Sequence, residues 1–279
     1  MDRAAIKTAQ NRNPEVFILS KTRFGKRVAT FVLMFSTPVA ILLLWEILSR
    51  YGFIRLSILP APTTVGRTFL DMLETGEIFR HLGVSILRVL QGYAIGAAFG
   101  VFLGILMGLF KKVDTALVLV TGILRPIPII AWVPMLILWM GIDEASKVTV
   151  IAIGSFWPVL LNTVHGIKST DTKYLEVAQI LEKSRLKILT KVVLPSALPS
   201  IFTGLRIGIG IAWMSVIGAE LIAAASGIGY LIMYARELSQ PDVMLVGVFS
   251  IGITGILIDV LIRKIEAAVL KWNINISKN

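Results

Sequence analysis

Few residues of this sequence are of the types that make and break bonds. It has no cysteine and only two histidines, His81 and His165, which lie far apart in the chain. Thiolate catalysis, disulfides and cysteine metal sites are therefore excluded, and a histidine-rich metal site is not expected. We predict no catalytic residue and no metal ligand. The chain also lacks a G-x-x-x-x-G-K-[ST] phosphate loop, so we do not expect it to bind and hydrolyse ATP through such a loop.

The residues most able to bind a ligand or a partner are the charged ones inside apolar runs. A charge in hydrocarbon is energetically costly, so such a residue usually faces the interior of a helix bundle, water or a partner of opposite charge. Arg125 and Glu220 lie deepest in such runs. Either these two residues pair with each other, or Arg125 lines a solute pathway and attracts an anion. Both are pathway candidates, together with Trp132. Arg88 and Arg206 lie near the ends of apolar runs, where snorkelling accounts for them.

The composition places these residues in a membrane protein. Of the 279 residues, 56% are hydrophobic and only 16% are charged, and the mean hydropathy is +0.81. These values lie outside the range of soluble globular proteins. The formal net charge of +11 would suggest a nucleic-acid partner in a soluble protein. In a membrane protein, we attribute this positive charge to the topology of the chain and to its contact with an anionic lipid leaflet. We therefore expect no nucleic-acid partner.

Six apolar runs are long enough to cross a bilayer as helices. They cover residues 28–48, 84–110, 116–140, 146–164, 201–225 and 243–262. We therefore predict an all-α polytopic membrane protein with about six transmembrane helices. Between the first two runs, an extended proline-containing piece and a helical pattern predict an interfacial segment on the outer side.

The second apolar run carries a regular row of glycines. They occupy every fourth position, as Gly92, Gly96, Gly100, Gly104 and Gly108. Four residues advance about 400° around a helix, so these glycines form a slowly drifting ridge along which another helix can approach closely. The ridge is either a groove in which helices slide or rock, or a static packing seam.

The distribution of basic residues predicts the orientation. With the N-terminus inside, the inner segments hold 19 of the 28 Lys and Arg residues and the outer segments hold 6. The positive-inside rule then places both termini in the cytoplasm. The predicted organisation is a cytoplasmic tail at 1–27, the first span with its outer segment at 28–82, a core domain at 83–268 and a second cytoplasmic tail at 269–279.

The longest polar interval in the second half of the chain covers residues 170–199, on the predicted cytoplasmic side. Apolar residues recur there at three- and four-residue steps, as Tyr174, Leu175, Ala178 and Leu181. This spacing predicts a short amphipathic helix. A second helix follows, with Ser184 as its N-cap and Pro195 as its end. A helix pair that only covers the span ends is the alternative to a partner-binding element.

Two runs in this interval resemble the EAA signature of permease subunits of bacterial ABC importers, namely Glu176-Val177-Ala178 and Val192-Val193-Leu194-Pro195. The resemblance implies a coupling helix at about 172–194 that docks on a cytoplasmic ATPase. The implied coupling residues are Glu176, Ala178, Glu182, Leu194 and Pro195. Glu182 stands where the family usually has glycine. A glutamate with positive φ there would cost roughly 1 kcal/mol, so we expect Lys183 or Ser184 to carry the turn.

Further runs resemble the nitrate, sulfonate and taurine branch of these permeases. They lie at residues 59–62, 85–89, 125–128, 131–134, 204–206, 219–220 and 227–230. The resemblance implies an ABC type I importer fold in the bacterial cytoplasmic (inner) membrane, with a second copy of the chain as partner. It also implies two ATPase subunits, which bind ATP and Mg²⁺, and an extracytoplasmic solute-binding protein. The chain itself is not expected to bind a cofactor or to be an enzyme.

The resemblance implies a small anionic cargo of the alkanesulfonate, taurine or nitrate type. Relatives that carry vitamin precursors or aromatic compounds have similar permeases, so a different cargo is the first alternative. An ion-coupled secondary transporter is the second. It would need coupling-ion sites, usually built from buried carboxylates, for which the sequence offers Glu220 as the one deep candidate.

Overall fold

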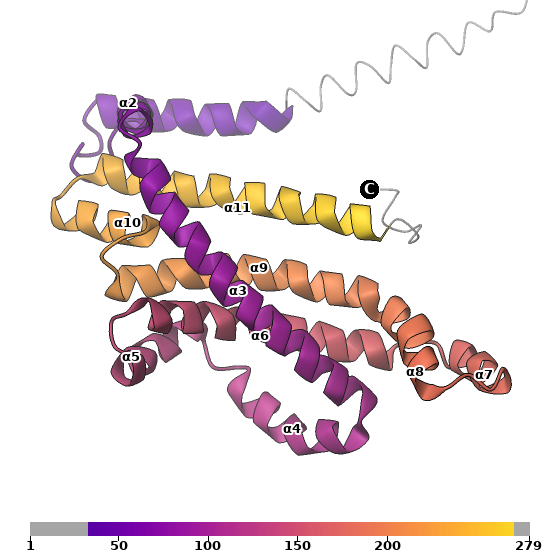
Figure 1. Cartoon of the computed structure of the whole chain (residues 1–279). Coiled ribbons are helices and arrows are strands. Elements are labelled where there is room, and N and C mark those ends of the chain that lie inside the picture. Colours follow the sequence, from indigo (N-terminus) through magenta and orange to yellow (C-terminus); the bar gives the residue numbers. More distant parts are fainter. Residues whose placement is uncertain (1–32, 271–279) are drawn as a thin grey trace, which may run out of the picture. The chain divides into compact units, whose positions relative to one another are not determined.

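The computed structural model describes residues 33–270, which contain helices and no strand (Figure 1). The chain divides into two units, residues 1–64 and 65–279, which are described separately. The predicted tail at 1–27, the start of the first predicted span and residues 271–279 lie outside the described residues. Within residues 33–270, five helices are long and apolar enough to cross a membrane, or six if one bent pair counts as a span. The prediction of an all-α polytopic membrane protein is confirmed.

The first unit contains the helix Leu33–Arg50, which corresponds to the first predicted span. Near the end of this helix, the carboxylate of Glu46 forms an ion pair with Arg50. The same carboxylate accepts hydrogen bonds from the backbone N–H of Thr63, at 3.1 Å, and from its hydroxyl, at 2.9 Å. Thr63 lies in the first turn of α2 (Pro62–Glu74), where backbone N–H groups have no partner within the helix. Glu46 therefore caps α2.

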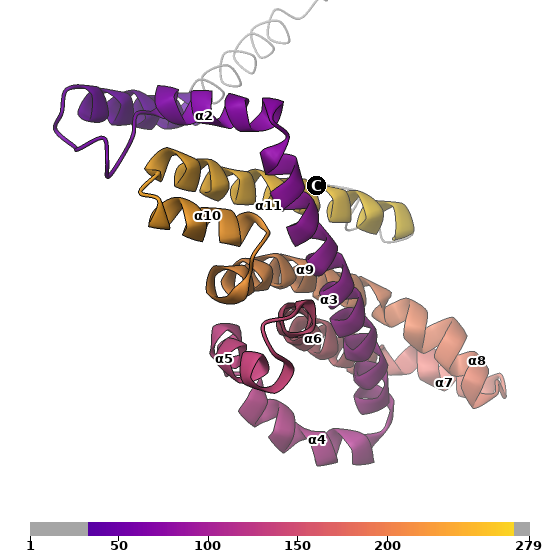
Figure 2. The same cartoon turned by 60° about the vertical axis from the view of Figure 1, so that its left-hand side comes forward.

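The second unit is built on three long helices that pack against one another (Figures 1 and 2). They are α3 (Glu77–Leu109), α6 (Glu144–Lys168) and α9 (Leu194–Ala223). The helix α11 (Pro241–Val269) packs on α9 and on the short α10 (Ile228–Glu237). Each of the four long helices corresponds to one predicted span with different bounds. Helix α10 lies between the last two predicted spans.

The side chains of α6 fill the glycine ridge of α3. A Cβ atom at Gly92 would lie 2.6 Å from the Cβ of Ile151, and one at Gly104 would lie 2.6 Å from the Cβ of Thr163. The other ridge glycines meet α6 in the same order, Gly96 at Ser155, Gly100 at Val159 and Gly108 at Ile167. The two helices therefore run in the same direction, and the ridge is a filled packing seam in this structure. Small residues are needed because lipid gives helices little hydrophobic drive to associate.

A neighbouring face of α6 makes a second small-residue contact, with α9, and Val159 touches glycines of both α3 and α9. A Cβ atom at Gly154 would meet the hydroxyl of Ser215, and one at Gly204 would lie 2.7 Å from the Cβ of Asn162. Here sequence numbers rise on one helix as they fall on the other, so α9 runs opposite to α6. Helices α3 and α9 also meet directly, since the hydroxyl of Tyr93 donates to the carbonyl of Leu205 at 3.0 Å, so the three helices pack around one shared core.

The predicted span at 116–140 is not one helix. The structure has α4 (Lys111–Leu124) and α5 (Ile129–Met140), which are bent by 95° at a short break. Pro126 and Pro128 cause the break, because proline lacks an amide hydrogen and disfavours the helical conformation of the residue before it. Since α3 ends where α4 begins and α5 leads into the start of α6, the break lies partway along the bundle.

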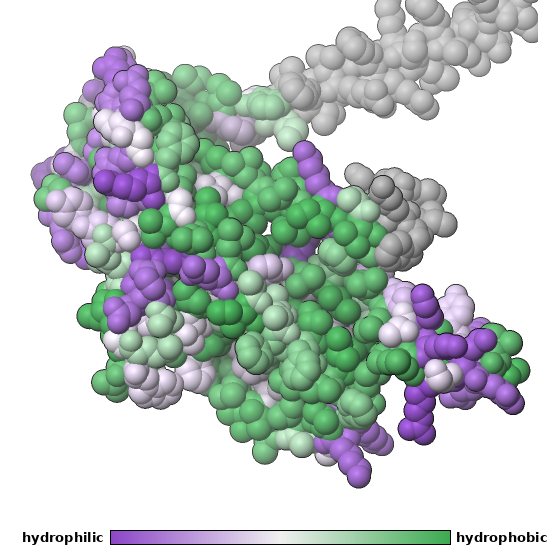
Figure 3. Space-filling view, viewed as in Figure 1, coloured by the Kyte–Doolittle hydropathy of each residue, from purple (hydrophilic) through white to green (hydrophobic). Residues whose placement is uncertain are grey.

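The polar interval forms α7 (Thr172–Ile180), α8 (Arg185–Ile188) and the π-helical η1 (Leu189–Val193). Figure 1 shows this segment beyond the ends of α6 and α9, at what we call the α7 end of the bundle. The opposite end, with α10 and the first turns of α3 and α6, is the α10 end. On the face in Figure 3, hydrophilic residues gather around α7 and α8, whereas α3 and α9 are mostly apolar.

The prediction that Pro195 ends the second helix is wrong, because α8, η1 and α9 follow one another without a break. The N–H of Leu194 donates to the carbonyl of Leu189, five residues back. This π-type register change falls immediately before Pro195, which lies in the first turn of α9. The missing N–H of a proline is tolerated at that position.

Candidate functional site

Helix α7 is closed at both ends by hydrogen bonds. At its start, the carboxylate of Asp171 accepts a bond of 2.9 Å from the backbone N–H of Lys173, as an N-cap does. At its end, the N–H of Glu182 donates to Gln179 at 2.8 Å and the N–H of Lys183 donates to Ala178 at 3.1 Å. These two bonds form a Schellman motif.

The residue that carries this turn is Glu182, with φ of +52°. The expectation that Lys183 or Ser184 would carry it is therefore wrong. The Schellman bonds require the left-handed conformation at this one position, which explains why glycine is favoured there. Glu182 adopts it because the two bonds offset a conformational cost of about 1 kcal/mol.

Most side chains of α7 are exposed, including large apolar ones. Ala178 is buried, with 6% of its surface exposed. The exposed apolar side chains of α7, the turn after it and α8 include Tyr174, Val177, Ile180, Leu181 and Leu186. Apolar side chains gathered on a short projecting helix indicate a contact surface for a partner.

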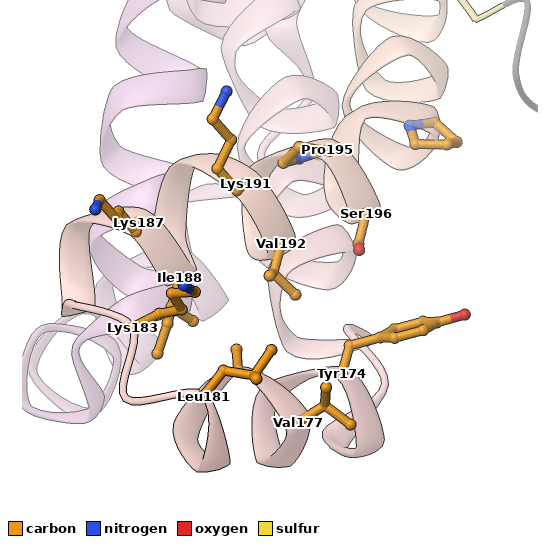
Figure 4. Close-up of a pocket in the computed structure, with 12 residues that line it drawn as sticks. Tyr174, Val177, Leu181, Lys183, Lys187, Ile188, Lys191, Val192, Pro195 and Ser196 are labelled. Atoms are coloured by element: carbon orange, nitrogen blue, oxygen red, sulfur yellow. The ribbon is translucent and has the colours of Figure 1, made fainter.

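A groove of about 760 Å³ separates α7 from α8, η1 and the start of α9. Figure 4 shows Val177 of α7 and Leu181, the residue after this helix, facing Val192 across the groove. Three lysines, Lys183, Lys187 and Lys191, also line the groove. The segment therefore combines an apolar surface with positive charge.

The five predicted coupling residues all lie in this segment, but in different surroundings. Ala178 and Pro195 line the groove. Glu176 is exposed on α7, Glu182 forms the turn and Leu194 is half-buried in the first turn of α9. Glu176 is thus free to contact a partner, whereas Ala178 positions α7 against its own chain.

The three predicted pathway residues lie in three different places. Arg125 lines a cavity of about 510 Å³ between the α4–α5 break, α6 and α9. Trp132 lines a separate cavity of about 470 Å³, which has an apolar lining from α3, α4 and α6. Glu220 is 1% exposed. The structure therefore does not bring these residues together in one site.

Glu220 pairs with Arg88, not with Arg125. The Nη1 atom of Arg88 lies 2.8 Å from the Oε1 atom of Glu220. The interpretation that Arg125 and Glu220 form a pair is therefore wrong. The prediction that Arg88 snorkels to the membrane surface is wrong as well, because only 3% of this residue is exposed. Arg206 also has a partner, since its Nε atom lies 2.9 Å from a carboxylate oxygen of Asp259 on α11.

The Arg88–Glu220 pair is the centre of a polar network at the α10 end. Arg88 also binds both carboxylate oxygens of Glu144, at 2.6 Å each, and donates to the backbone carbonyl of Ser226 at 2.7 Å. Glu144 is the first residue of α6, and its side chain is 63% exposed. One arginine thus connects α3 with α6, with the end of α9 and with the loop before α10.

The same network binds the first backbone N–H groups of α10. The carboxylate of Glu220 accepts a hydrogen bond of 2.9 Å from Gly229, and the hydroxyl of Ser85 accepts one of 2.9 Å from Ile228. His81 Nδ1 accepts a bond of 3.2 Å from Gly227, whose φ is +110°. A Cβ atom at Gly227 would collide with the Glu220 carboxylate, so glycine is required there on two counts.

Sequence reasoning missed this network, although a signal was present. The polar residues of α3 that take part in it are His81, Ser85 and Arg88. Steps of four and three residues place them on one face of a helix. A polar stripe on an otherwise apolar helix predicts a buried polar contact. As for metals, no three His, Asp or Glu side chains in residues 33–270 are grouped closely enough to hold an ion.

Comparisons with known proteins agree with this architecture. Residues 96–271 match the family described as binding-protein-dependent transport system inner membrane component. The aliphatic sulfonates transport permease protein SsuC of Bacillus subtilis is 40% identical over 84% of this chain and 85% of its own length. The taurine transport system permease protein TauC of Escherichia coli is 33% identical, covering 86% of this chain and 90% of its own.

Other similar proteins carry different names. The bicarbonate transport system permease protein CmpB of Synechocystis is 37% identical over 78% of this chain and 81% of its own. Among solved structures, the inward-facing methionine ABC transporter MetNI has a chain with a TM-score of 0.59 at 18% identity, covering 66% of this chain and 92% of that chain. An amino acid ABC transporter gives 0.61 at 16% identity, covering 72% and 98%.

Proposed function

Since the chain belongs to the family of binding-protein-dependent transport system inner membrane components, we propose that it is the permease subunit of an ATP-driven ABC importer. It forms the path through the membrane and makes or breaks no covalent bond. Two ATPase subunits bind ATP and Mg²⁺, a second copy of this chain completes the permease, and a solute-binding protein delivers the cargo from outside. The membership of the chain in this family carries the proposal.

The α7 segment is the proposed docking element for the ATPase. Its exposed apolar side chains and the lysines beside them suit a partner surface with an apolar hollow and acidic residues. The continuous helix from α8 through η1 into α9 gives this segment a stiff connection to the centre of the bundle. Movement of the ATPase subunits would therefore be transmitted to α9 and, through the close α6–α9 contact, to α6.

The proposed orientation follows from this docking. The α7 end faces the cytoplasm, and both termini lie on the same side, as the excess of Lys and Arg there predicts. The α10 end faces the solute-binding protein. The membrane is the bacterial cytoplasmic (inner) membrane.

The proposed cargo is a small anion of the alkanesulfonate, taurine, nitrate or bicarbonate type. The names of the similar permeases SsuC, TauC and CmpB support this class. Arg125 supports it as well, because it gives a cavity of the bundle a positive charge. An ion-coupled secondary transporter would need a carboxylate that can exchange its partner, and Glu220 is engaged by Arg88, Ser85 and Gly229.

Reconstitution into proteoliposomes tests the proposal. The chain is purified with its ATPase and combined with its solute-binding protein, and uptake of labelled taurine, ethanesulfonate, nitrate and bicarbonate is measured with and without ATP. We expect uptake of at least one of these anions that depends on ATP and on the binding protein. Uptake driven by an ion gradient in the isolated chain would instead support a secondary transporter.

A further inference from the structure

The cavity next to Arg125 lies about midway along α6 and α9. Its lining includes Gly154 and Trp157 of α6, near the middle of Glu144–Lys168, and Ile207 and Ile211 of α9, near the middle of Leu194–Ala223. The break between α4 and α5 closes it from a third side. Broken spans are where transporters place binding sites, because irregular backbone is tolerated in a membrane when it lines a cavity.

Arg125 enters this cavity without a partner of its own. Within residues 33–270, no hydrogen bond or ion pair joins its side chain to another residue, in contrast to Arg88 and Arg206. Arg125 is exposed on the wall of this cavity, and an unpaired guanidinium within a membrane is costly unless water or an anion neutralises it. The planar fork of an arginine binds carboxylate, sulfonate or phosphate oxygens with two parallel hydrogen bonds.

A second polar group points to the same ligand. Asn162 lines the cavity and uses one amide hydrogen in a bond of 2.8 Å to the carbonyl of Pro158. Its other amide hydrogen is available to an acceptor. The rest of the lining is apolar, mainly from Trp157, Leu161 and Ile211. The volume of about 510 Å³ falls in the range of small-molecule sites.

We propose that this cavity is a binding subsite for the oxyanion head of the transported solute, which rests on the proposed function. Arg125 binds two oxygens of the anion and Asn162 donates to it. The apolar wall accepts a short organic group such as the chain of an alkanesulfonate. The separate cavity next to Trp132 has no charged residue in its lining and is not part of the subsite.

The natural absence of cysteine allows a test that does not depend on transport. A Leu161→Cys variant carries a single thiol on the cavity wall and leaves Arg125 and Asn162 in place. Its thiolate attacks a methanethiosulfonate reagent, forms a mixed disulfide and releases methanesulfinate. The rates with the anionic sulfonatoethyl reagent and with the cationic trimethylammonium-ethyl reagent are compared in the complete complex. Leu117→Cys, which lies on the apolar cavity and about two helical turns before Arg125, is the matched control.

We expect the ratio of anionic to cationic rates in Leu161→Cys to exceed the ratio in Leu117→Cys by about tenfold, because a nearby positive charge concentrates the anionic reagent. Adding Arg125→Gln should remove this preference, and saturating taurine or ethanesulfonate should slow the reaction. If Leu161→Cys does not fold, Ile207→Cys places a thiol on the same cavity from α9. Equal ratios in cavity and control would overturn the proposal.

A transport measurement provides the second arm. In the complete complex, Arg125→Gln should lower anion uptake by about tenfold or more, as expected for losing a hydrogen-bonded charge. ATP hydrolysis stimulated by the binding protein should persist, and Arg125→Lys should retain part of the uptake. If the unchanged complex moves no solute, the proposed function fails. If it transports and Arg125→Gln transports equally well, only the subsite fails.

Discussion

Arg88 of α3 and Glu220 of α9 form an ion pair of 2.8 Å in which both side chains are almost fully buried. The Glu220 carboxylate also accepts bonds from Ser85 and from the backbone of Gly229. The pair therefore fixes the first turn of α10 to two of the three central helices. The two residues are 132 positions apart in the sequence, so this ion pair joins the start of α3 to the end of α9.

We predict that Glu220→Gln strongly destabilises the protein. Removing one partner of a buried pair leaves the Arg88 charge with only the exposed Glu144 to balance it, at a cost of about 3–5 kcal/mol. The amide also repeats only some of the hydrogen bonds that the carboxylate accepts. The measurement is the midpoint temperature of unfolding in detergent, which is monitored as the loss of the monodisperse peak in size-exclusion chromatography.

Glu144→Gln is the matched control, because it changes the other carboxylate bound by Arg88. Its side chain is mostly exposed, so the loss should be at most about 1 kcal/mol. A double variant, Arg88→Met with Glu220→Met, should recover part of the stability lost in Glu220→Gln. Equal destabilisation by Glu220→Gln and Glu144→Gln would contradict the assignment of Glu220 as the buried centre.

The glycine seam between α3 and α6 predicts a position-specific effect of one methyl group. In Gly104→Ala, the new Cβ would lie 2.6 Å from the Cβ of Thr163, so the helices must separate. Overpacking of this kind costs about 1–3 kcal/mol. In Gly83→Ala, on the same helix, no heavy atom lies within 4 Å of the new Cβ. Thermal stability should fall in Gly104→Ala and be unchanged or higher in Gly83→Ala, and the reverse order would refute the seam.

The turn at Glu182 predicts opposite effects of two substitutions. Glu182→Gly removes the strain of a positive φ and should stabilise the end of α7 by up to about 1 kcal/mol. Glu182→Val places a β-branched side chain in the same conformation and should loosen the turn. Hydrogen exchange of the N–H groups of Glu182 and Lys183 reports this turn directly. Slower exchange in the valine variant than in the glycine variant would show that another residue carries the turn.

The sequence predicts the features of this fold that depend on local patterns. Apolar runs identified the long helices, and four-residue glycine spacing identified the face of α3 that meets α6. The broken span was predictable too, since Pro126 and Pro128 are separated by one residue in the middle of the apolar run, but hydropathy alone merges α4 and α5. These features follow from backbone chemistry and helix periodicity.

The remaining features depend on contacts between distant segments. Glu220 binds Arg88 because antiparallel packing brings the end of α9 to the start of α3, and no local pattern states this register. Pro195 lies inside a continuous helix because η1 shifts the hydrogen bonds before it. Glu182 takes a conformation that its residue type disfavours because two hydrogen bonds compensate. In each case, an interaction in the folded chain overrides the local preference.

The most direct test of the proposed coupling role of α7 is ATP-driven anion uptake by the reconstituted complex with Glu176→Lys. Glu176 is exposed, so its reversal should leave folding and membrane insertion unchanged. Glu74→Lys makes the same charge change at an exposed carboxylate of α2. We predict that Glu176→Lys abolishes uptake and releases the ATPase while Glu74→Lys transports normally. Full ATP-driven uptake by Glu176→Lys, with the ATPase still bound, would contradict the account.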